Sequence, residues 1–215
     1  MNRWLWVAAA GGAGLVSSGL FAGVLGLGRR AFVAAFAALA LPLIVEHGRR
    51  EGVRPLPHLA RRWRAGLIGG LVLGAILVGN VISQPSSPAP AGTALAADLL
   101  WLGVAYGIVD ALLLSVLPVL AVYGSQPAHH LAGATGRLRW GAAALLASLT
   151  VTALYHVGFP EFRGLALVRP LIGNGLITLG YLVTGNPLTP LVAHVLMHGA
   201  AVLHGAETTV QLPPH

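Results

Sequence analysis

Long uninterrupted apolar segments constrain this chain more than any other feature of its sequence. Several runs of roughly 17–25 residues carry few charges, and this is the length that a helix needs to cross a hydrocarbon core of about 30 Å. Only 9% of the 215 residues are charged, against about 25% in an ordinary soluble domain. The chain therefore lacks the charge to cover a water-facing surface, and we expect an all-α, polytopic transmembrane bundle of about seven helices.

The positions of the apolar segments predict where these helices lie. The first follows Met1-Asn2-Arg3 and is longer than the apolar core of a secretory signal peptide, which is the competing interpretation. The expected helices cover residues 4–27, 31–45, 65–83, 98–123, 140–158, 170–184 and 188–205. We divide the chain into N-terminal helices with a basic loop (1–97), a core of four helices (98–205) and a short tail (206–215).

The net charge of +7 comes from arginine, because the chain has no lysine. The arginines lie in short segments between the expected helices, which is the positive-inside pattern of membrane proteins, so no nucleic-acid partner is expected. We place the basic segment 47–64 and the loop 124–139 in the cytoplasm, and the uncharged proline-rich segment 84–97 outside. The composition, rich in Ala, Gly, Leu and Pro and with arginine instead of lysine, suggests a GC-rich prokaryotic genome, so we expect a prokaryotic cell membrane. The loop 124–139 carries His129, His130, Arg137 and Arg139.

Residues 31–45 give conflicting topological signals. Arg29 and Arg30 precede this segment, and the longer basic segment follows it. If both arginine clusters were cytoplasmic, the segment would be re-entrant or lie in the interface. We favour a membrane-crossing helix with Arg29 and Arg30 outside, because the longer cluster should dominate the orientation.

Glycines recur every four residues in the segment 65–83, at Gly66, Gly70 and Gly74. Residues four apart share one face of a helix, and small residues there let two membrane helices approach closely. This stripe predicts a packing face for a neighbouring helix.

Four ionisable side chains lie within the apolar helices of the second half of the chain. Such groups are costly at membrane depth and are functional candidates by default. Without cysteine, the chain has no disulfide, thiolate metal site or cysteine nucleophile. One shared site would satisfy all four groups together, although each also has a purely structural interpretation as a helix–helix hydrogen bond. The four candidates are Asp110, His156, His194 and His198.

His194 and His198 are four residues apart, so their rings leave the same face of a helix. This spacing suits two ligands of one metal ion or two groups acting on one substrate. The surrounding sequence HVLMH has valine where the zincin motif HExxH has glutamate, so that motif is absent. His204 lies ten residues from His194, on another face and near the helix end, and we exclude it.

Two stretches resemble signatures of the CPBP intramembrane proteases, the family of CAAX-processing and bacteriocin-processing membrane endopeptidases. GLITLGYLVTGNPLTPLVAHVLMH, residues 175–198, resembles the last signature, in which a glycine-rich helix and a turn precede HxxxN or HxxxD. His194 matches its histidine, and His198 stands in place of the Asn or Asp. TVTALYHVG, residues 150–158, resembles the signature FxxxH, with His156 matching and Thr152 at the Phe position.

The first family signature, EExxxR, is the poorest match. The corresponding stretch GIVDALLLS offers Asp110 as its single acid and has no arginine. The resemblance covers residues 99–205 and implies an endopeptidase that cuts a peptide or membrane-protein substrate within the lipid bilayer. Where the family's paired glutamates activate water, Asp110 would have to act alone.

The departures from the family signatures, with Asp110 in place of the paired glutamates and His198 in place of Asn or Asp, also favour a bound metal. Three imidazoles and one carboxylate, from His156, His194, His198 and Asp110, form a suitable ligand set for zinc or another divalent transition ion. Metal-bound water has a pKa lowered towards about 7, and Asp110 would accept its proton or complete the coordination shell. Without metal, Asp110 would act as the base and the histidines would stabilise the oxyanion.

This hypothesis places the site in a polar cavity open to the cytoplasm, with Tyr106 either orienting Asp110 or packing. It requires His156, near the end of its helix, to lie close to His194 in the middle of another. Two rival classes stay open: a catalytically inactive membrane scaffold descended from the protease fold, and a haem- or metal-binding membrane protein that uses the histidines as ligands.

Overall fold

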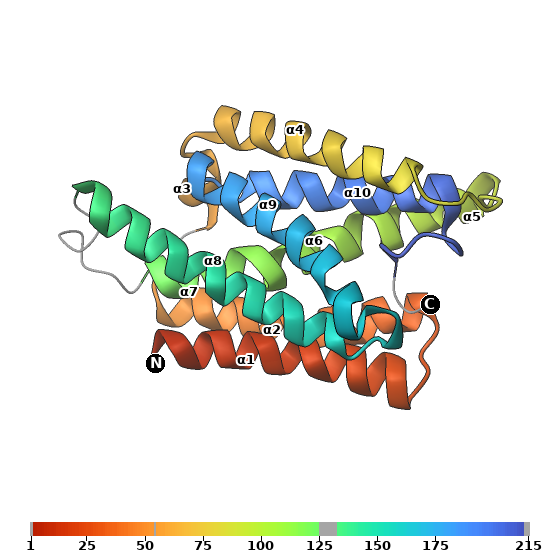
Figure 1. Ribbon diagram of the computed structural model, residues 1–215, viewed down its shortest axis with the longest axis horizontal. Coiled ribbons are helices and arrows are strands. Elements are labelled where there is room, and N and C mark those ends of the chain that lie inside the picture. Colours follow the sequence, from red (N-terminus) through yellow and green to blue (C-terminus); the bar gives the residue numbers. More distant parts are fainter. Residues whose placement is uncertain (1, 54, 125–132, 213–215) are drawn as a thin grey trace.

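The computed structural model describes residues 2–53, 55–124 and 133–212 and confirms an all-α bundle (Figure 1). Among these residues, seven helices are long and apolar enough to cross a membrane, as expected for a multi-pass membrane protein. Residues 125–132, which include His129 and His130, lie outside the described part. The seven helices are Arg3–Val24, Arg29–Arg50, Trp63–Ile82, Gly92–Tyr123, Gly133–Val157, Gly164–Thr184 and Leu188–Gly205.

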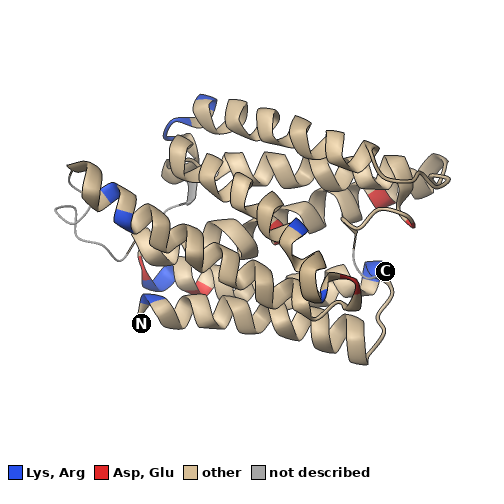
Figure 2. Ribbon diagram, in the orientation of Figure 1, with Lys and Arg blue, Asp and Glu red and all other residues tan. Residues whose placement is uncertain are grey.

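The ambiguous segment 31–45 lies inside α2 (Arg29–Arg50), a helix of 22 residues that includes Pro42. At a rise of about 1.5 Å per residue, such a helix is long enough to cross the hydrocarbon core. Arg29 and Arg30 therefore lie at the opposite end of the bundle from Arg49 and Arg50 (Figure 2). This arrangement agrees with the crossing interpretation and not with a re-entrant segment.

The helix from Gly92 to Tyr123 is the central helix of the bundle. In an apolar stretch of 18 residues within this helix, 72% is buried inside the bundle. The corresponding share is 22–44% in the other six helices. It comprises α5 (Gly92–Asp98), the π-helical η2 (Leu99–Ala105), α6 (Tyr106–Ala111), the π-helical η3 (Leu112–Val116) and α7 (Leu117–Tyr123). The segment that carries Tyr106 and Asp110 is thus held between two π-helical turns, which often accompany functional sites.

Several helices extend beyond their predicted ends. The central helix begins at Gly92 instead of Asp98, and α8 (Gly133–Val157) begins seven residues before Trp140. The apolar pattern marks only the part of a helix that crosses the membrane, and the backbone stays helical where the residues become polar. α9 (Val168–Thr184) and α10 (Leu188–Gly205) lie close to their predicted bounds.

The glycine stripe of α4 (Trp63–Ile82) packs against α10, as predicted (Figure 1). A Cβ atom added to Gly70 would lie 2.7 Å from Cβ of Val192 and 3.1 Å from the carbonyl oxygen of Leu188. Gly66 and Gly74 face Asn186 and Leu196 in the same way. Because the glycines let the two backbones approach, an N-terminal helix packs directly on the helix that carries the histidine pair.

The two ends of the bundle differ in charge (Figure 2). One end carries most of the described arginines, including Arg3, the pair at 49–50, and those at 61–64 and 137–139. The other end carries fewer arginines, among them Arg29 and Arg30 at the start of α2, and acidic segments lie there too, including Asp98, which pairs with Arg30. The positive-inside rule predicts that the arginine-rich end faces the cytoplasm. Residues 84–97 lie at the other end, and their external position stays a prediction.

Cysteine labelling tests this orientation, because the chain has no cysteine of its own. Ser86 and Ala60 are both exposed and lie at opposite ends of the bundle. We expect Ser86→Cys to react with a membrane-impermeant maleimide in intact cells, and Ala60→Cys to react only after lysis. The reverse pattern would show that the arginine-rich end faces outward.

The glycine stripe gives a stability test. Gly70→Ala should lower the free energy of unfolding by about 1–3 kcal/mol, because the added methyl group overpacks the contact between α4 and α10. Gly79→Ala is the matched control on the same helix, since a Cβ atom there meets nothing within 4 Å. Equal thermal unfolding midpoints for the two variants in detergent would contradict the close-packing role of the stripe.

Candidate functional site

Asp110 lies on α6 inside the bundle, with 4% of its surface exposed. Its Oδ2 atom is 3.2 Å from Nε2 of His198 and 3.6 Å from Nε2 of His194. Both histidines are on α10 and are 2% exposed. The four-residue spacing therefore brings both rings to one carboxylate oxygen, and the three side chains form one cluster.

Two glycines on the central helix allow this contact. A Cβ atom added to Gly107 would lie 3.0 Å from Cα of Val195, and one added to Gly103 would lie 3.2 Å from Cα of Gly199. These glycines form a GxxxG pattern, which lets membrane helices approach at backbone distance. The sequence analysis did not use this pattern, although its position before Asp110 indicates which face of the helix meets α10.

Hydrogen bonds to the backbone fix the tautomers of two histidines. Nδ1 of His194 donates to the carbonyl oxygen of Pro190 at 2.9 Å, and Nδ1 of His156 donates to that of Thr152 at 2.8 Å. A carbonyl only accepts, so Nδ1 carries the proton of each neutral ring and Nε2 carries the lone pair. Such a bond commonly orients a histidine that acts as a base or a ligand.

The tautomer of His194 implies a place for a mobile proton. Its Nε2 lone pair lies 3.6 Å from the carboxylate oxygen of Asp110 that His198 also contacts. A lone pair and a carboxylate repel each other, and a proton on Nε2 or on the carboxyl group relieves the repulsion. The cluster is therefore suited to taking up and releasing one proton.

Two polar atoms of the cluster have no partner among the described residues. Oδ1 of Asp110 and Nδ1 of His198 are both buried without a hydrogen bond. An unpartnered buried polar atom costs about 1–3 kcal/mol, and more when it is charged. Both residues line a cavity of about 570 Å³, so water or a ligand in that cavity can satisfy these atoms.

His156 lines the same cavity from the last turn of α8. Its ring contacts Tyr155 and Phe162 edge-on, at centroid distances of 5.0 and 4.9 Å. In the described part of the chain, no hydrogen bond joins it to Asp110, His194 or His198. The structure thus brings all four predicted residues to one cavity, with three in one cluster and His156 contributed by a different helix, α8.

The cavity extends from Asp110 to polar side chains near the less basic end of the bundle. The side chains there include Asn80, Gln84, Arg169 and Gln211. This is the end that carries residues 84–97, opposite the arginine-rich end (Figures 1 and 2). With the arginine-rich end in the cytoplasm, as the positive-inside rule predicts, the cavity extends away from the cytoplasm, so the two predictions made from the sequence do not agree with each other in this structure. The reason is that a carboxylate in the middle of a helix does not indicate towards which end the helices diverge.

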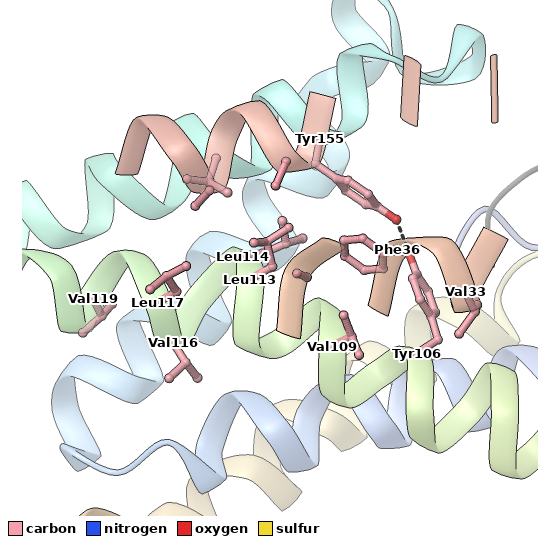
Figure 3. Close-up of a cluster of buried hydrophobic side chains, with 14 of the residues drawn as sticks. Val33, Phe36, Tyr106, Val109, Leu113, Leu114, Val116, Leu117, Val119 and Tyr155 are labelled. Carbon is pink, nitrogen blue, oxygen red and sulfur yellow. Dashed lines mark hydrogen bonds between the residues drawn. The ribbon is translucent and has the colours of Figure 1, made fainter. Parts of the chain in front are cut away.

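Tyr106 lies one turn before Asp110, but its hydroxyl does not contact the carboxylate. It forms a hydrogen bond with the hydroxyl of Tyr155 at 2.8 Å, and its ring lies 4.5 Å from that of His198 (Figure 3). Both tyrosines line the cavity. Tyr106 therefore packs against the site rather than orienting Asp110 directly.

A second polar cluster, which the sequence analysis missed, joins three helices beside the cavity. Asn174 of α9 accepts from Ser115 at 2.7 Å and donates to Ser148 at 3.0 Å and Thr152 at 2.6 Å. Thr178 bonds Ser148 at 2.8 Å. A lone asparagine in an apolar helix was the available signal, since such residues hold membrane helices together. This network is fully bonded and serves packing.

The donor set suits zinc chemically, but its present geometry does not form a metal site. Among the described residues, no group of three or more His, Cys, Asp or Glu side chains is placed to hold a metal ion. A zinc ion would therefore require the side chains to move together. The zinc hypothesis stays a prediction.

No family model matches this chain, and no characterised protein or solved structure matches it either. The resemblance to the CPBP proteases therefore depends on the residues themselves, and family membership stays a prediction.

Elemental analysis tests the zinc hypothesis. If the four residues bind zinc, protein purified with added zinc should carry about one ion per chain, and His198→Ala should carry less because a ligand is lost. His204→Ala is the control, since Nε2 of His204 bonds the carbonyl oxygen of Gln84 outside the cluster. Equal zinc content in wild type and His198→Ala would remove zinc from the hypothesis.

Proposed function

We propose that this chain is an intramembrane endopeptidase of a prokaryotic cell membrane, which hydrolyses a peptide bond of a membrane-associated substrate at the Asp110–His194–His198 cluster. The observation that carries the proposal is a buried carboxylate with two histidines on one of its oxygens and a free oxygen beside a cavity. The two histidines meet one carboxylate oxygen, and the other oxygen, Oδ1, has no partner among the described residues and is available to a molecule in the cavity.

The cavity supplies what hydrolysis in a membrane needs, namely water and space for a chain. About 570 Å³ lies within the usual range of 300–1,000 Å³ for ligand pockets. Its walls include the apolar side chains of Ile76, Ile172 and Leu176, which suit an apolar peptide. Its polar end, near Asn80 and Gln84, gives water a route to Asp110.

In the proposed reaction, Oδ1 of Asp110 binds a water molecule and takes its proton. The water oxygen attacks the carbonyl carbon, and the C=O electron pair moves to the oxygen. The C–N bond then breaks, and the nitrogen leaves with a proton returned by Asp110 or His194. His198 holds Oδ2 at 3.2 Å and keeps the carboxyl group oriented throughout. A positioned base of this kind contributes typically 10²–10⁴-fold to a rate.

The resemblance to the CPBP proteases points to the same residues. His156 and His194 match histidines of two family signatures, and Asp110 lies in the helix where the family's acids are expected. No step above requires a metal ion, so the proposal holds whether or not zinc binds.

Substitution of Asp110 tests the proposal. We would incubate the purified protein in micelles with pooled synthetic peptides of about 20 apolar residues and map the cuts by mass spectrometry. We expect cleavage by wild type and a fall in kcat of about 10²-fold or more for Asp110→Asn, because the base is lost. Asp98→Asn is the matched control, since that carboxylate pairs with Arg30 away from the cavity.

Two outcomes would redirect the interpretation. Cleavage that is unaffected by Asp110→Asn would remove Asp110 from the mechanism, and no cleavage of any peptide would favour the inactive scaffold. The absorption spectrum of the same preparation tests the haem alternative, because bound haem gives a Soret band.

A further inference from the structure

The pair of tyrosine hydroxyls beside Asp110 has one proton more than its hydrogen bonds use. Tyr106 and Tyr155 come from different helices, and their hydroxyl oxygens are 2.8 Å apart (Figure 3). Each hydroxyl carries one hydrogen, and the bond between them uses only one of the two. In the part of the chain that the structure describes, neither hydroxyl has another hydrogen-bond partner.

The remaining O–H group is therefore a free donor in an apolar interior. The tyrosines are 2% and 1% exposed, so bulk water does not satisfy it. Leaving a buried donor unbonded costs about 1–3 kcal/mol. Both tyrosines line the cavity that contains Asp110, so an acceptor located in that cavity can take this hydrogen bond.

Aromatic packing holds the donor in place. The ring of Phe36 stacks on Tyr155 at a centroid distance of 5.3 Å and lies 6.0 Å from Tyr106 (Figure 3). The ring of Tyr106 also contacts His198 at 4.5 Å. A donor fixed before the reaction needs no reorganisation when charge develops, and this is the property that makes an oxyanion hole effective.

We propose that the Tyr106–Tyr155 pair donates a hydrogen bond to the carbonyl oxygen of the substrate and stabilises the oxyanion. This inference rests on the proposed hydrolysis and names amide or ester carbonyls as the ligand class. As the water oxygen attacks, the C=O electron pair moves to the oxygen, and the free O–H bonds it more strongly. When the C–N bond breaks, the pair returns to form C=O, and the tyrosine keeps its proton.

Phenylalanine substitutions remove the donor and keep the rings. For a peptide that wild type cleaves, we expect Tyr106→Phe/Tyr155→Phe to lower kcat by about 10²-fold and to change KM by less than about twofold. Each single variant retains one hydroxyl with its proton, so its loss should be smaller. Tyr181→Phe is the matched control, because that buried hydroxyl bonds His58 at 3.2 Å and does not line the cavity.

A tetrahedral probe gives a second measurement that does not depend on turnover. The hydrate of N-acetyl-leucyl-phenylalanine trifluoromethyl ketone imitates the tetrahedral intermediate, and its binding is observed by ¹⁹F NMR. We expect tight binding to wild type and to Tyr181→Phe, and at least about tenfold weaker binding to the double variant and to the more affected single variant.

The outcomes separate the two proposals. If wild type cleaves peptide and binds the ketone, and the double variant and both single variants do so equally well, the tyrosine donor is overturned and the proposed hydrolysis stands. If wild type neither cleaves nor binds, both proposals fall. If the double variant unfolds, the two single variants decide between the outcomes. A lower kcat and a lower affinity for the ketone in either single variant, at unchanged KM, supports the tyrosine donor. Single variants that both keep the wild-type kcat and ketone affinity overturn it.

Discussion

The burial of one carboxylate in an apolar helix is the constraint on which the arrangement of the site depends. Asp110 lies in the most buried helix of the bundle, where an unpaired charge would cost a few kcal/mol even on the most lenient insertion scales. His194 and His198 reduce that cost only if α10 comes within contact distance. Gly103 and Gly107 allow this approach on one side of α10, and the α4 glycine stripe packs on another.

The interior polar groups fall into two kinds that differ in how completely they are bonded. The cluster around Asn174 uses the donors and acceptors of its amide group on three helices, as a structural network should. The groups around Asp110 do not, because Oδ1 of Asp110, Nδ1 of His198 and one tyrosine proton lack partners in the described structure. Both kinds line the same cavity, and the unused hydrogen-bonding capacity gathered at Asp110, His198 and the tyrosine pair is what distinguishes the candidate site from the Asn174 network.

Much of the fold could be predicted, because one-dimensional patterns determine it. Apolar segments locate the membrane helices, and the four-residue spacing of His194 and His198 guarantees that they share a face. Element ends were less predictable: α8 begins seven residues before its apolar stretch, since helical geometry continues where hydrophobicity stops. Tyr106 was placed as a neighbour of Asp110 along the helix, but its hydroxyl partner comes from another helix 49 residues away.

The sequence by itself therefore determined the membrane bundle, its approximate number of membrane-length helices and the four ionisable residues that need an explanation. Hydrophobicity and helical periodicity are local properties, and the solvent imposes them on each segment separately. Only the tertiary structure decided which oxygen the histidines contact, towards which end the cavity extends, and that two tyrosines share a hydrogen bond beside Asp110. Those features depend on the relative rotation, tilt and divergence of helices, which result from side-chain packing between segments distant in the chain.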